Sequence, residues 1–235
     1  DDSLWAEAFE HRFAGGELEG HALGNLVLVG LAETLGSFPA ALDEAARLLG
    51  AVGRVLPAST EAVELKAEVG PVGAGRASST EVEGQVAVAN SGNIRRVGLV
   101  PADASPPADA VAAIAAADQV VLAPGSLYTS IVPVVCVVEL REALATTSAR
   151  VVQVANLEPQ LPETAGLDAT DHLRAVLDHG ARVDTFLYQP GGLAVDLDRI
   201  RGWGVEPVAG TMAAANGHTH DPERLAVMLG ALLSP

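Results

Sequence analysis

The spacing of apolar residues changes twice along the chain, and each change predicts a different kind of structure. In the first fifty residues the apolar positions recur every three or four residues, which predicts helices at about 2–13, 23–35 and 38–50. The second of these is apolar around most of its circumference, so we expect it to be largely buried. The third carries Pro39 in its first turn and stops at Gly50, as helices commonly do.

Between about residues 53 and 100 the period shortens to that of β-strands. Short β-type runs, divided by turn residues, occur at GRVLPAS, AVELKAEVG, TEVEGQVAVANSG and NIRRVGLVP. The glycine- and serine-rich run VGPVGAGRASS, residues 69–79, predicts a loop tip between two of them. This section therefore predicts an antiparallel β insert.

From residue 108 onward, strand-like and helix-like segments alternate. Strands are predicted at QVVLA, RVVQVAN, VDTFLYQ and, more weakly, GVEPVAG, and helices at ADAVAAIAAAD, VELREALATTS, DATDHLRAVLDHG and DPERLAVMLGALL. Alternation of this kind implies right-handed crossovers and a parallel sheet with helices on both faces. The pattern predicts an α/β fold.

Composition narrows the class of partner. The 235 residues are 49% hydrophobic but only 3% aromatic, which fits a helix-rich α/β protein better than an all-β one. The net charge of −16 argues against nucleic acid, because binding a polyanion depends on lysine and arginine, and it disfavours anionic membranes. A small anionic ligand stays open, since backbone N–H groups at a helix start bind phosphate regardless of net charge.

The lone cysteine and the absence of long apolar runs point to a compartment. Cys136 excludes an internal disulfide and indicates a reducing environment, and its apolar surroundings favour a buried structural thiol over a nucleophile. No apolar run approaches the roughly 18–20 residues of a membrane span, and no signal peptide opens the sequence. We predict a cytoplasmic protein.

One candidate site is the loop 124-PGSLYTS-130, which follows the predicted strand QVVLA. In doubly wound sheets ligands bind at the carboxyl ends of the strands. Gly125 allows close backbone approach, and Ser126, Thr129 and Ser130 supply hydroxyls near a helix start, an arrangement suited to phosphate or sugar oxygens. An ordinary turn with Ser126 as the helix N-cap is the alternative, and the residues alone leave both open.

Three further stretches carry candidate chemistry. Asn156 ends the next strand and precedes a loop longer than the usual two to six residues, which indicates either function or irregularity. His21 and Asn25 lie one helical turn apart and could point to one site, unless His21 only caps the helix. The tail 218-HTHDPE-223 could hold a metal, but Asp221 and the two residues after it are also a standard helix start, which we favour.

Several motifs with known mechanics are missing from the sequence. It contains no G-x-S-x-G elbow, no G-x-G-x-x-G and no G-x-x-x-x-G-K-[ST], and Cys136 cannot by itself form the cysteine cluster of a structural zinc site. Hydrolase and P-loop chemistry therefore have little support.

Taken together, these stretches resemble the YvcK-like family, also called gluconeogenesis factors, within the CofD-like superfamily. The matching stretches follow the family's order across nearly the whole chain: GHALGNLVLVGL, GRVLPAS, IRRVGLVP, AADQVVLAPGSLYTSIVP, VANLEPQLPETAGLDATDHL and HDPERLA. The P-G-S-L-Y-T-S run is quite specific, because CofD transferases typically carry a P-S-N-P-type turn there.

The resemblance implies a three-layer α/β/α Rossmann-like fold, here one domain over residues 1–235 with the β insert at about 53–100. It implies a cytosolic regulator that binds UDP-N-acetylglucosamine and links carbon metabolism to cell-wall synthesis and cell shape, without established catalysis. Regulatory protein partners and a homo-oligomer are compatible with it, and no metal or cofactor is implied. By matching motif, the residues around the ligand are His21, Asn25, Gly125, Ser126, Thr129, Ser130 and Asn156.

The chain also departs from the family pattern. It starts at the helix that follows the family's first strand and G-G-G-T-G loop, so we expect an N-terminally incomplete domain without the principal phosphate loop. Ala22 replaces the serine of G-H-S-L-G-N, and Thr219 stands where the family has the arginine of R-H-D-P, a plausible pyrophosphate partner.

Two alternatives stay open. One is a CofD-like transferase that moves a phospholactyl-type group from a nucleotide diphosphate donor to a deazaflavin acceptor, which needs acidic ligands for Mg²⁺. The other is a degenerate paralogue that no longer binds nucleotide sugar and is kept for protein–protein contacts.

Overall fold

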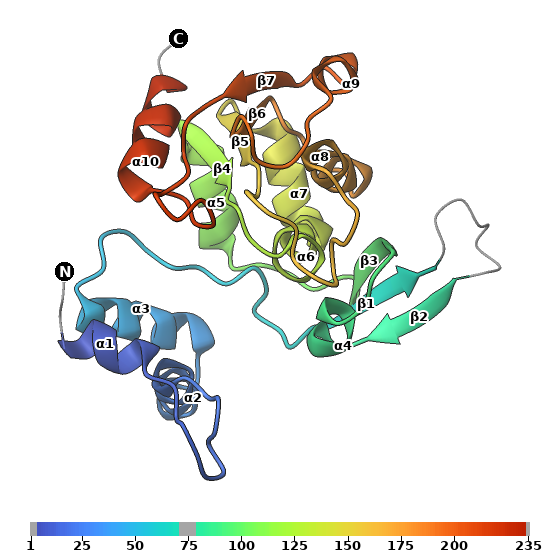
Figure 1. Ribbon diagram of the computed structural model, residues 1–235. Helices are drawn as coiled ribbons and strands as arrows, with labels where there is room; N and C mark the ends of the chain where they lie inside the picture. Colours follow the sequence, from blue (N-terminus) through green and yellow to red (C-terminus); the bar gives the residue numbers. More distant parts are fainter. Residues whose placement is uncertain (1–3, 71–78, 234–235) are drawn as a thin grey trace. The chain divides into compact units, whose positions relative to one another are not determined.

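The computed structural model describes residues 4–70 and 79–233 (Figure 1). Contacts along the backbone divide the chain into two compact units, residues 1–60 and 61–235. Each unit is described by itself.

The first unit consists of three helices: α1 (Leu4–Glu10), α2 (Leu23–Leu35) and α3 (Phe38–Leu49). The predicted boundaries of α3 are confirmed. The side chain of Ser37 accepts a hydrogen bond from the Ala40 N–H at 3.3 Å, and Gly50 ends the helix in the left-handed conformation, φ 64°. Such a φ favours glycine because it lacks a Cβ atom.

The expectation that α2 is largely buried is wrong. Gly24 is its one buried residue, because α1 and α3 cover only one side of the helix within this unit. Gly24 itself marks a close approach, since a Cβ atom there would lie 2.8 Å from the Phe9 ring and from the Phe9 carbonyl oxygen. The apolar residues of α2 therefore include some on a face of the helix that α1 and α3 do not cover.

The second unit begins with a three-stranded antiparallel sheet. It contains β1 (Glu64–Val69), β2 (Thr80–Glu83) and β3 (Ile94–Val100) in the order β2-β1-β3, as the β insert predicts. Two details of the prediction are wrong: residues 53–59 form no strand, and Gln85–Ala89 form a short helix, α4. Gly84, at φ 89°, turns the chain out of β2, and Val88 then packs into the core. The predicted loop tip lies largely outside the described residues.

The larger sheet is parallel, as the alternating pattern predicts. Its strands are β4 (Gln119–Leu122), β5 (Arg150–Val154), β6 (Thr185–Tyr188) and β7 (Glu206–Ala209), in the order β4-β5-β6-β7. The predicted helices are α5 (Ala108–Ala116), α7 (Val138–Thr146), α8 (Ala169–Asp178) and α10 (Pro222–Ala231). The pattern misses three short elements: a π-helical turn η2 (Leu127–Ile131), α6 (Val132–Cys136) and α9 (Leu197–Gly202).

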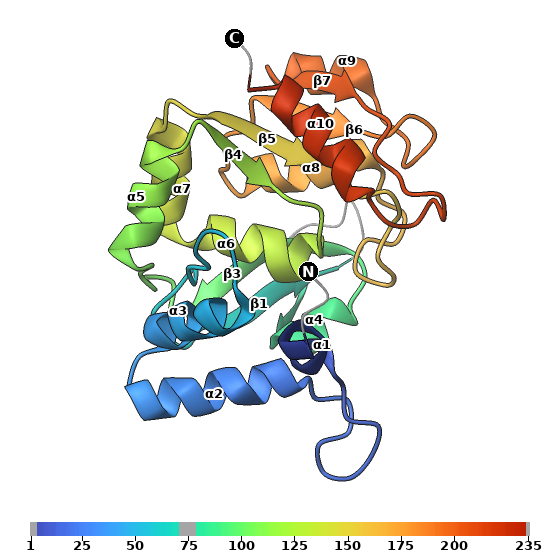
Figure 2. The same cartoon turned by 90° about the vertical axis from the view of Figure 1, so that its left-hand side faces the viewer.

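The side chains of β5 and β6 alternate between two cores and so define three layers. Val154 and Leu187 face one side, where residues of α10 pack against them. Phe186 faces the other side, in a cluster with Leu173 and other residues of α8 and α6. Figures 1 and 2 accordingly show α10 on one side of the parallel sheet and α8 on the other. This is the predicted α/β/α arrangement.

A buried histidine joins the antiparallel sheet to α8. The Val97 N–H of β3 donates to Nε2 of His179, just after α8, at 3.1 Å, and Nδ1 of His179 lies 2.7 Å from the Ala175 carbonyl oxygen. Because Nε2 accepts, Nδ1 must carry the proton and donate to Ala175, so the ring is neutral. Burial lowers the pKa of His179, against the opposing effect of the hydrogen bond to the Ala175 carbonyl.

Lowering the pH is therefore expected to destabilise the second unit. The folded-state pKa of His179 lies below its usual value of 6.5, so the unfolded chain takes up the proton first. The contribution of His179 to stability is full at pH values above its usual pKa and is lost as the pH falls toward its folded-state pKa, and this one group adds at most about 1.4 kcal/mol per pH unit to the slope. Urea unfolding followed by Trp203 fluorescence, in a Trp5→Phe background, measures this slope.

The variant His179→Leu isolates the contribution of this ring. Leucine cannot accept from the Val97 N–H, so the free energy of unfolding should fall by about 1–3 kcal/mol at neutral pH. The pH slope should also become shallower. A variant that keeps the slope of the parent chain would show that His179 does not cause it.

Candidate functional site

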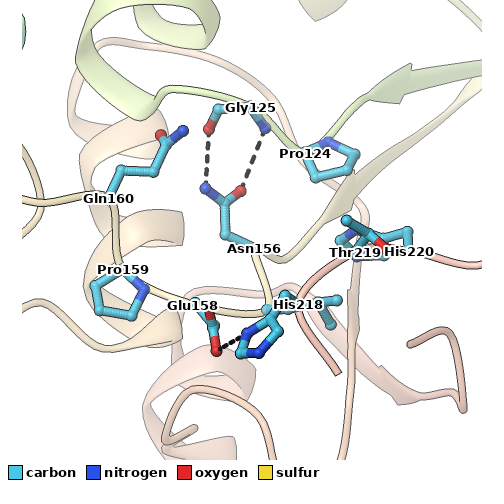
Figure 3. A pocket seen from close by; sticks show the side chains of 10 residues that line it. Pro124, Gly125, Asn156, Glu158, Pro159, Gln160, His218, Thr219 and His220 are labelled. Carbon is cyan, nitrogen blue, oxygen red and sulfur yellow. Dashed lines mark hydrogen bonds and ion pairs between the residues drawn. The ribbon is translucent and has the colours of Figure 1, made fainter. Parts of the chain in front are cut away.

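The candidate site is a pocket at the carboxyl ends of β4 and β5, with a volume of about 380 Å³ (Figure 3). Three loops form its walls: the β4–η2 connection, the β5–α8 connection and the tail loop between β7 and α10. Such an edge is where parallel sheets bind ligands. The lining residues are Pro124, Gly125, Asn156, Leu157, Glu158, Pro159, Gln160, His218, Thr219 and His220.

Asn156 joins the first two loops. Its Oδ1 accepts from the Gly125 N–H at 3.4 Å, and its Nδ2 donates to the Gly125 carbonyl oxygen at 2.9 Å (Figure 3). A carboxamide carries the same donor and acceptor as a peptide group. Asn156 therefore continues the pairing of β4 with β5 past the ends of both strands.

Glu163 joins the same two loops a second time, further along. One carboxylate oxygen accepts from the Tyr128 N–H at 2.6 Å, and the other accepts from the Thr129 hydroxyl at 3.1 Å. Glu163 is 4% exposed, so its carboxylate is solvated by these groups instead of by water. The chain places its own carboxylate at the start of the η2 turn.

The turn itself begins at Ser126. Its carbonyl oxygen accepts from the N–H groups of both Ser130 and Ile131, each at 3.0 Å, which produces the wide π-helical geometry. Burial raises the pKa of Tyr128 to about 12, helped by the nearby carboxylates, Asp171 first among them. The phenol of Tyr128 is consequently neutral and part of the core.

The tail loop forms the third wall and is positioned by Gln189. Oε1 of Gln189 accepts from the N–H groups of Met212 at 2.6 Å and Ala213 at 2.9 Å. Across the pocket, Nδ1 of His218 lies 2.7 Å from Oε1 of Glu158 (Figure 3). This last contact joins the tail loop to the β5–α8 loop.

His220 contributes a neutral ring to the pocket. Burial lowers its pKa, against the opposing effect of the Ala155 carbonyl. Its Nε2 atom is buried and has no hydrogen-bond partner within residues 4–70 and 79–233. Asp221, next to it, caps α10 by accepting from the Arg224 N–H at 3.0 Å, which confirms the helix-start interpretation of the tail.

The structure brings together only some of the residues predicted to surround a ligand. Gly125 and Asn156 both line the pocket. Ser126 and Ser130 lie in the same loop but outside the lining, and the Thr129 hydroxyl is bonded to Glu163. The binding role of all five stays a prediction.

His21 and Asn25 belong to the first unit. Both are exposed, and α2 begins at Leu23, so His21 precedes the helix and does not share a helical face with Asn25. Ala22 stands at the N-cap and makes no side-chain capping bond. The interpretation of His21 as a cap is therefore wrong, and a ligand contact by His21 or Asn25 stays a prediction.

The lone cysteine behaves as the apolar surroundings indicate. Cys136 is half-buried, and its Sγ lies 3.6 Å from the Val97 carbonyl oxygen. Burial raises the pKa of its thiol, so the group is neutral and poorly nucleophilic at neutral pH.

Metal ligands and membrane spans were sought over the same described ranges. Within them, no group of three or more His, Cys, Asp or Glu side chains is arranged to hold a metal ion. None of the described helices is long and apolar enough to cross a membrane.

Comparison with known proteins identifies the family. The model of the family described as 2-phospho-L-lactate transferase CofD matches residues 1–202. A gluconeogenesis factor from Mycobacterium leprae is 37% identical over an alignment of 263 positions, covering 94% of this chain and 73% of that protein. The chain therefore belongs to the CofD family, and its curated relatives carry the name gluconeogenesis factor.

Two further relatives support the same family assignment. A gluconeogenesis factor from Mycobacterium tuberculosis is 47% identical over 178 residues, covering 75% of this chain and 52% of its own length, so the chain spans about half of that relative. The crystal structure of a UPF0052 family member from Bacillus halodurans superposes with a TM-score of 0.87 at 31% identity, covering 97% of this chain and 78% of that one. The fold is thus that of the UPF0052 proteins.

Reasoning from the sequence missed the residues that shape the pocket. Glu163 meets partners that lie 35 and 34 residues earlier, and Glu158 meets His218 sixty residues later. No local sequence pattern predicts contacts between residues so far apart in the chain. The one available signal is the acidic pair Glu158 and Glu163 at a strand's carboxyl end, in a connection whose other charged residue is Asp168, the N-cap of α8.

Removing the Glu163 carboxylate should destabilise the second unit. Glu163→Ala leaves the Tyr128 N–H and the Thr129 hydroxyl without acceptors, which is expected to lower the free energy of unfolding by about 3 kcal/mol. Glu163→Gln keeps one oxygen for the Tyr128 N–H and should cost about a third as much. Urea unfolding measures the stability of both variants. Glu139→Ala is the control, because Glu139 is an exposed residue of α7 and its loss should change the free energy of unfolding little. Equal stabilities of Glu163→Ala and the parent chain would contradict the role described.

A charge at residue 156 should separate the two loops. Asn156→Asp cannot donate to the Gly125 carbonyl and places two acceptors against each other, so we expect a loss of about 1–2 kcal/mol at neutral pH. Asn90→Asp is the matched control, because Asn90 also donates to a carbonyl, that of Val86 at 2.8 Å, but at an exposed site. Thermal unfolding of both variants should show the larger decrease for Asn156→Asp, and the reverse order would count against the pairing.

Proposed function

We propose that this chain is a nucleotide-sugar-binding regulatory protein whose ligand is UDP-N-acetylglucosamine. The proposal includes a cytosolic location and a role in linking carbon metabolism to cell-wall synthesis and cell shape, exerted through ligand binding and contacts with regulatory partners. Turnover of the ligand is not part of it.

The observation that carries the proposal is the pocket at the carboxyl ends of β4 and β5. It lies where α/β sheets bind nucleotides, and its volume of about 380 Å³ is within the range of small-molecule sites. Gly125 and Asn156, two of the residues that the family resemblance places around the ligand, both line it. Membership of a family whose curated relatives are named gluconeogenesis factors supports the metabolic role.

A second candidate is the transferase that gives the family model its description, 2-phospho-L-lactate transferase CofD. It rests on the match over residues 1–202. It requires transfer of a phospholactyl-type group to a deazaflavin acceptor in the presence of Mg²⁺. Formation of that product by this chain would favour the enzyme over the regulator.

The proposal predicts saturable binding of UDP-N-acetylglucosamine to the full chain in calorimetry. Thr219 lines the pocket, where the family resemblance implies an arginine. Thr219→Arg adds a cation that the described lining lacks, so it should tighten binding about tenfold through one charge-assisted hydrogen bond to the pyrophosphate. Thr146→Arg is the matched control, since Thr146 is an exposed residue of α7 that does not line the pocket.

The control variant should bind as the parent chain does. The absence of heat and of any thermal shift, both for the parent chain and for Thr219→Arg at millimolar ligand, would reject the proposal. Equal tightening by both arginines would show a general charge effect instead of a site beside residue 219.

A further inference from the structure

We infer that the pocket holds the uncharged, hydroxyl-rich part of the ligand, a single sugar unit, and excludes phosphate. This inference rests on the proposed function and deepens it by naming which part of a nucleotide sugar the described pocket takes. It is argued from the charges around the pocket and from the groups left free to bind.

Two of the donors that a phosphate at this loop could use are already bonded to a carboxylate of the protein. A phosphate at the P-G-S-L-Y-T-S loop would use the N–H groups at the start of the following turn. There the Glu163 carboxylate accepts from the Tyr128 N–H at 2.6 Å and from the Thr129 hydroxyl at 3.1 Å. Because Glu163 is 4% exposed, it is fixed in the core and is not a side chain that an incoming anion could displace.

The charges of the residues that line the pocket also disfavour phosphate. Among the described residues that line it, none is lysine or arginine, and the acidic one is Glu158. Arg224, a cation of the neighbouring helix α10, donates to the Ala213 carbonyl oxygen at 2.8 Å and pairs with Asp221. A phosphate in the pocket would therefore meet a carboxylate and no cationic lysine or arginine side chain, which is unfavourable in a partly enclosed site.

The same lining suits hydroxyl groups. Glu158 offers carboxylate oxygens, of which Oε1 is in contact with His218, and carboxylates are strong acceptors for O–H donors. The main chain of Gln160 is fixed through the Thr164 hydroxyl at 2.8 Å, and its side-chain amide extends toward Gly125 (Figure 3). This amide both donates and accepts, as a sugar hydroxyl does.

Apolar side chains complete the pocket. Pro124, Leu157 and Pro159 line it between the polar groups. A sugar ring presents C–H faces between its hydroxyls, so it matches a wall that mixes a few polar groups with apolar surface. The volume of about 380 Å³ lies near the lower end for small-molecule sites, which fits one part of a nucleotide sugar better than the whole.

The test compares four probes: N-acetylglucosamine, UDP-N-acetylglucosamine, UDP and inorganic phosphate. Each is titrated calorimetrically into the full chain, into Glu158→Gln and into Glu139→Gln, the exposed control. Glu158→Gln removes the charge and one acceptor but keeps an amide that can hydrogen-bond His218 in either ring tautomer. Thermal unfolding of each variant checks that the fold is retained.

The inference expects N-acetylglucosamine to bind the parent chain and Glu139→Gln equally, and Glu158→Gln about tenfold more weakly. It also expects saturating phosphate not to displace the sugar. Displacement of the sugar by phosphate, or tighter binding of UDP-N-acetylglucosamine by Glu158→Gln, would overturn it. So would nucleotide-sugar binding that is independent of Glu158, although the proposed function would then stand.

The remaining outcomes separate the two proposals. Binding of the free sugar that depends on Glu158, without binding of UDP-N-acetylglucosamine, would support the inference and overturn the proposed function. If neither molecule binds, both proposals are overturned.

Discussion

The buried Glu163 carboxylate is the interaction on which the candidate site depends. A carboxylate in the core is costly unless hydrogen bonds replace its water, and the Tyr128 N–H and the Thr129 hydroxyl do so here. In return, those two groups are held at fixed places at the start of the η2 turn. The loop after β4 consequently has one conformation, set by a residue of the next loop. The same carboxylate makes the start of that turn negative.

The walls of the pocket are joined to one another at several points. Asn156 and Glu163 both come from the β5–α8 connection, and both hold the connection that follows β4. Gln189 fixes the tail loop from the end of β6, and the contact between Glu158 and His218 closes the third side. A site held in this way binds with little loss of conformational entropy. The parallel sheet supplies the edge, and the side chains between the loops supply the shape.

The sequence predicted the layers better than the site, for physical reasons that particular residues illustrate. Strands such as QVVLA and RVVQVAN carry apolar residues at consecutive positions because both faces of the parallel sheet are covered, and that pattern is local. The segment Gln85–Ala89 shows the limit, since alternating valines predicted a strand where Gly84 starts a helix. Contacts across thirty or more residues, such as that of Asn156 with Gly125, have no local signature. The sequence located the loop but assigned Asn156 to the ligand, whereas its amide also joins two loops of the protein.

The placement of the two joining residues has a consequence for how such a protein changes over generations. Asn156 and Glu163 bracket the segment 157–162, and Glu158, Pro159 and Gln160 between them line the pocket without holding the loops together through side-chain bonds to the β4 connection. The inner residues that line the pocket and the flanking residues that hold the β4 connection are thus different members of the same short stretch. A substitution at Pro159 or Gln160 would therefore change the pocket lining while the side-chain contacts of Asn156, Glu158 and Glu163 stay in place.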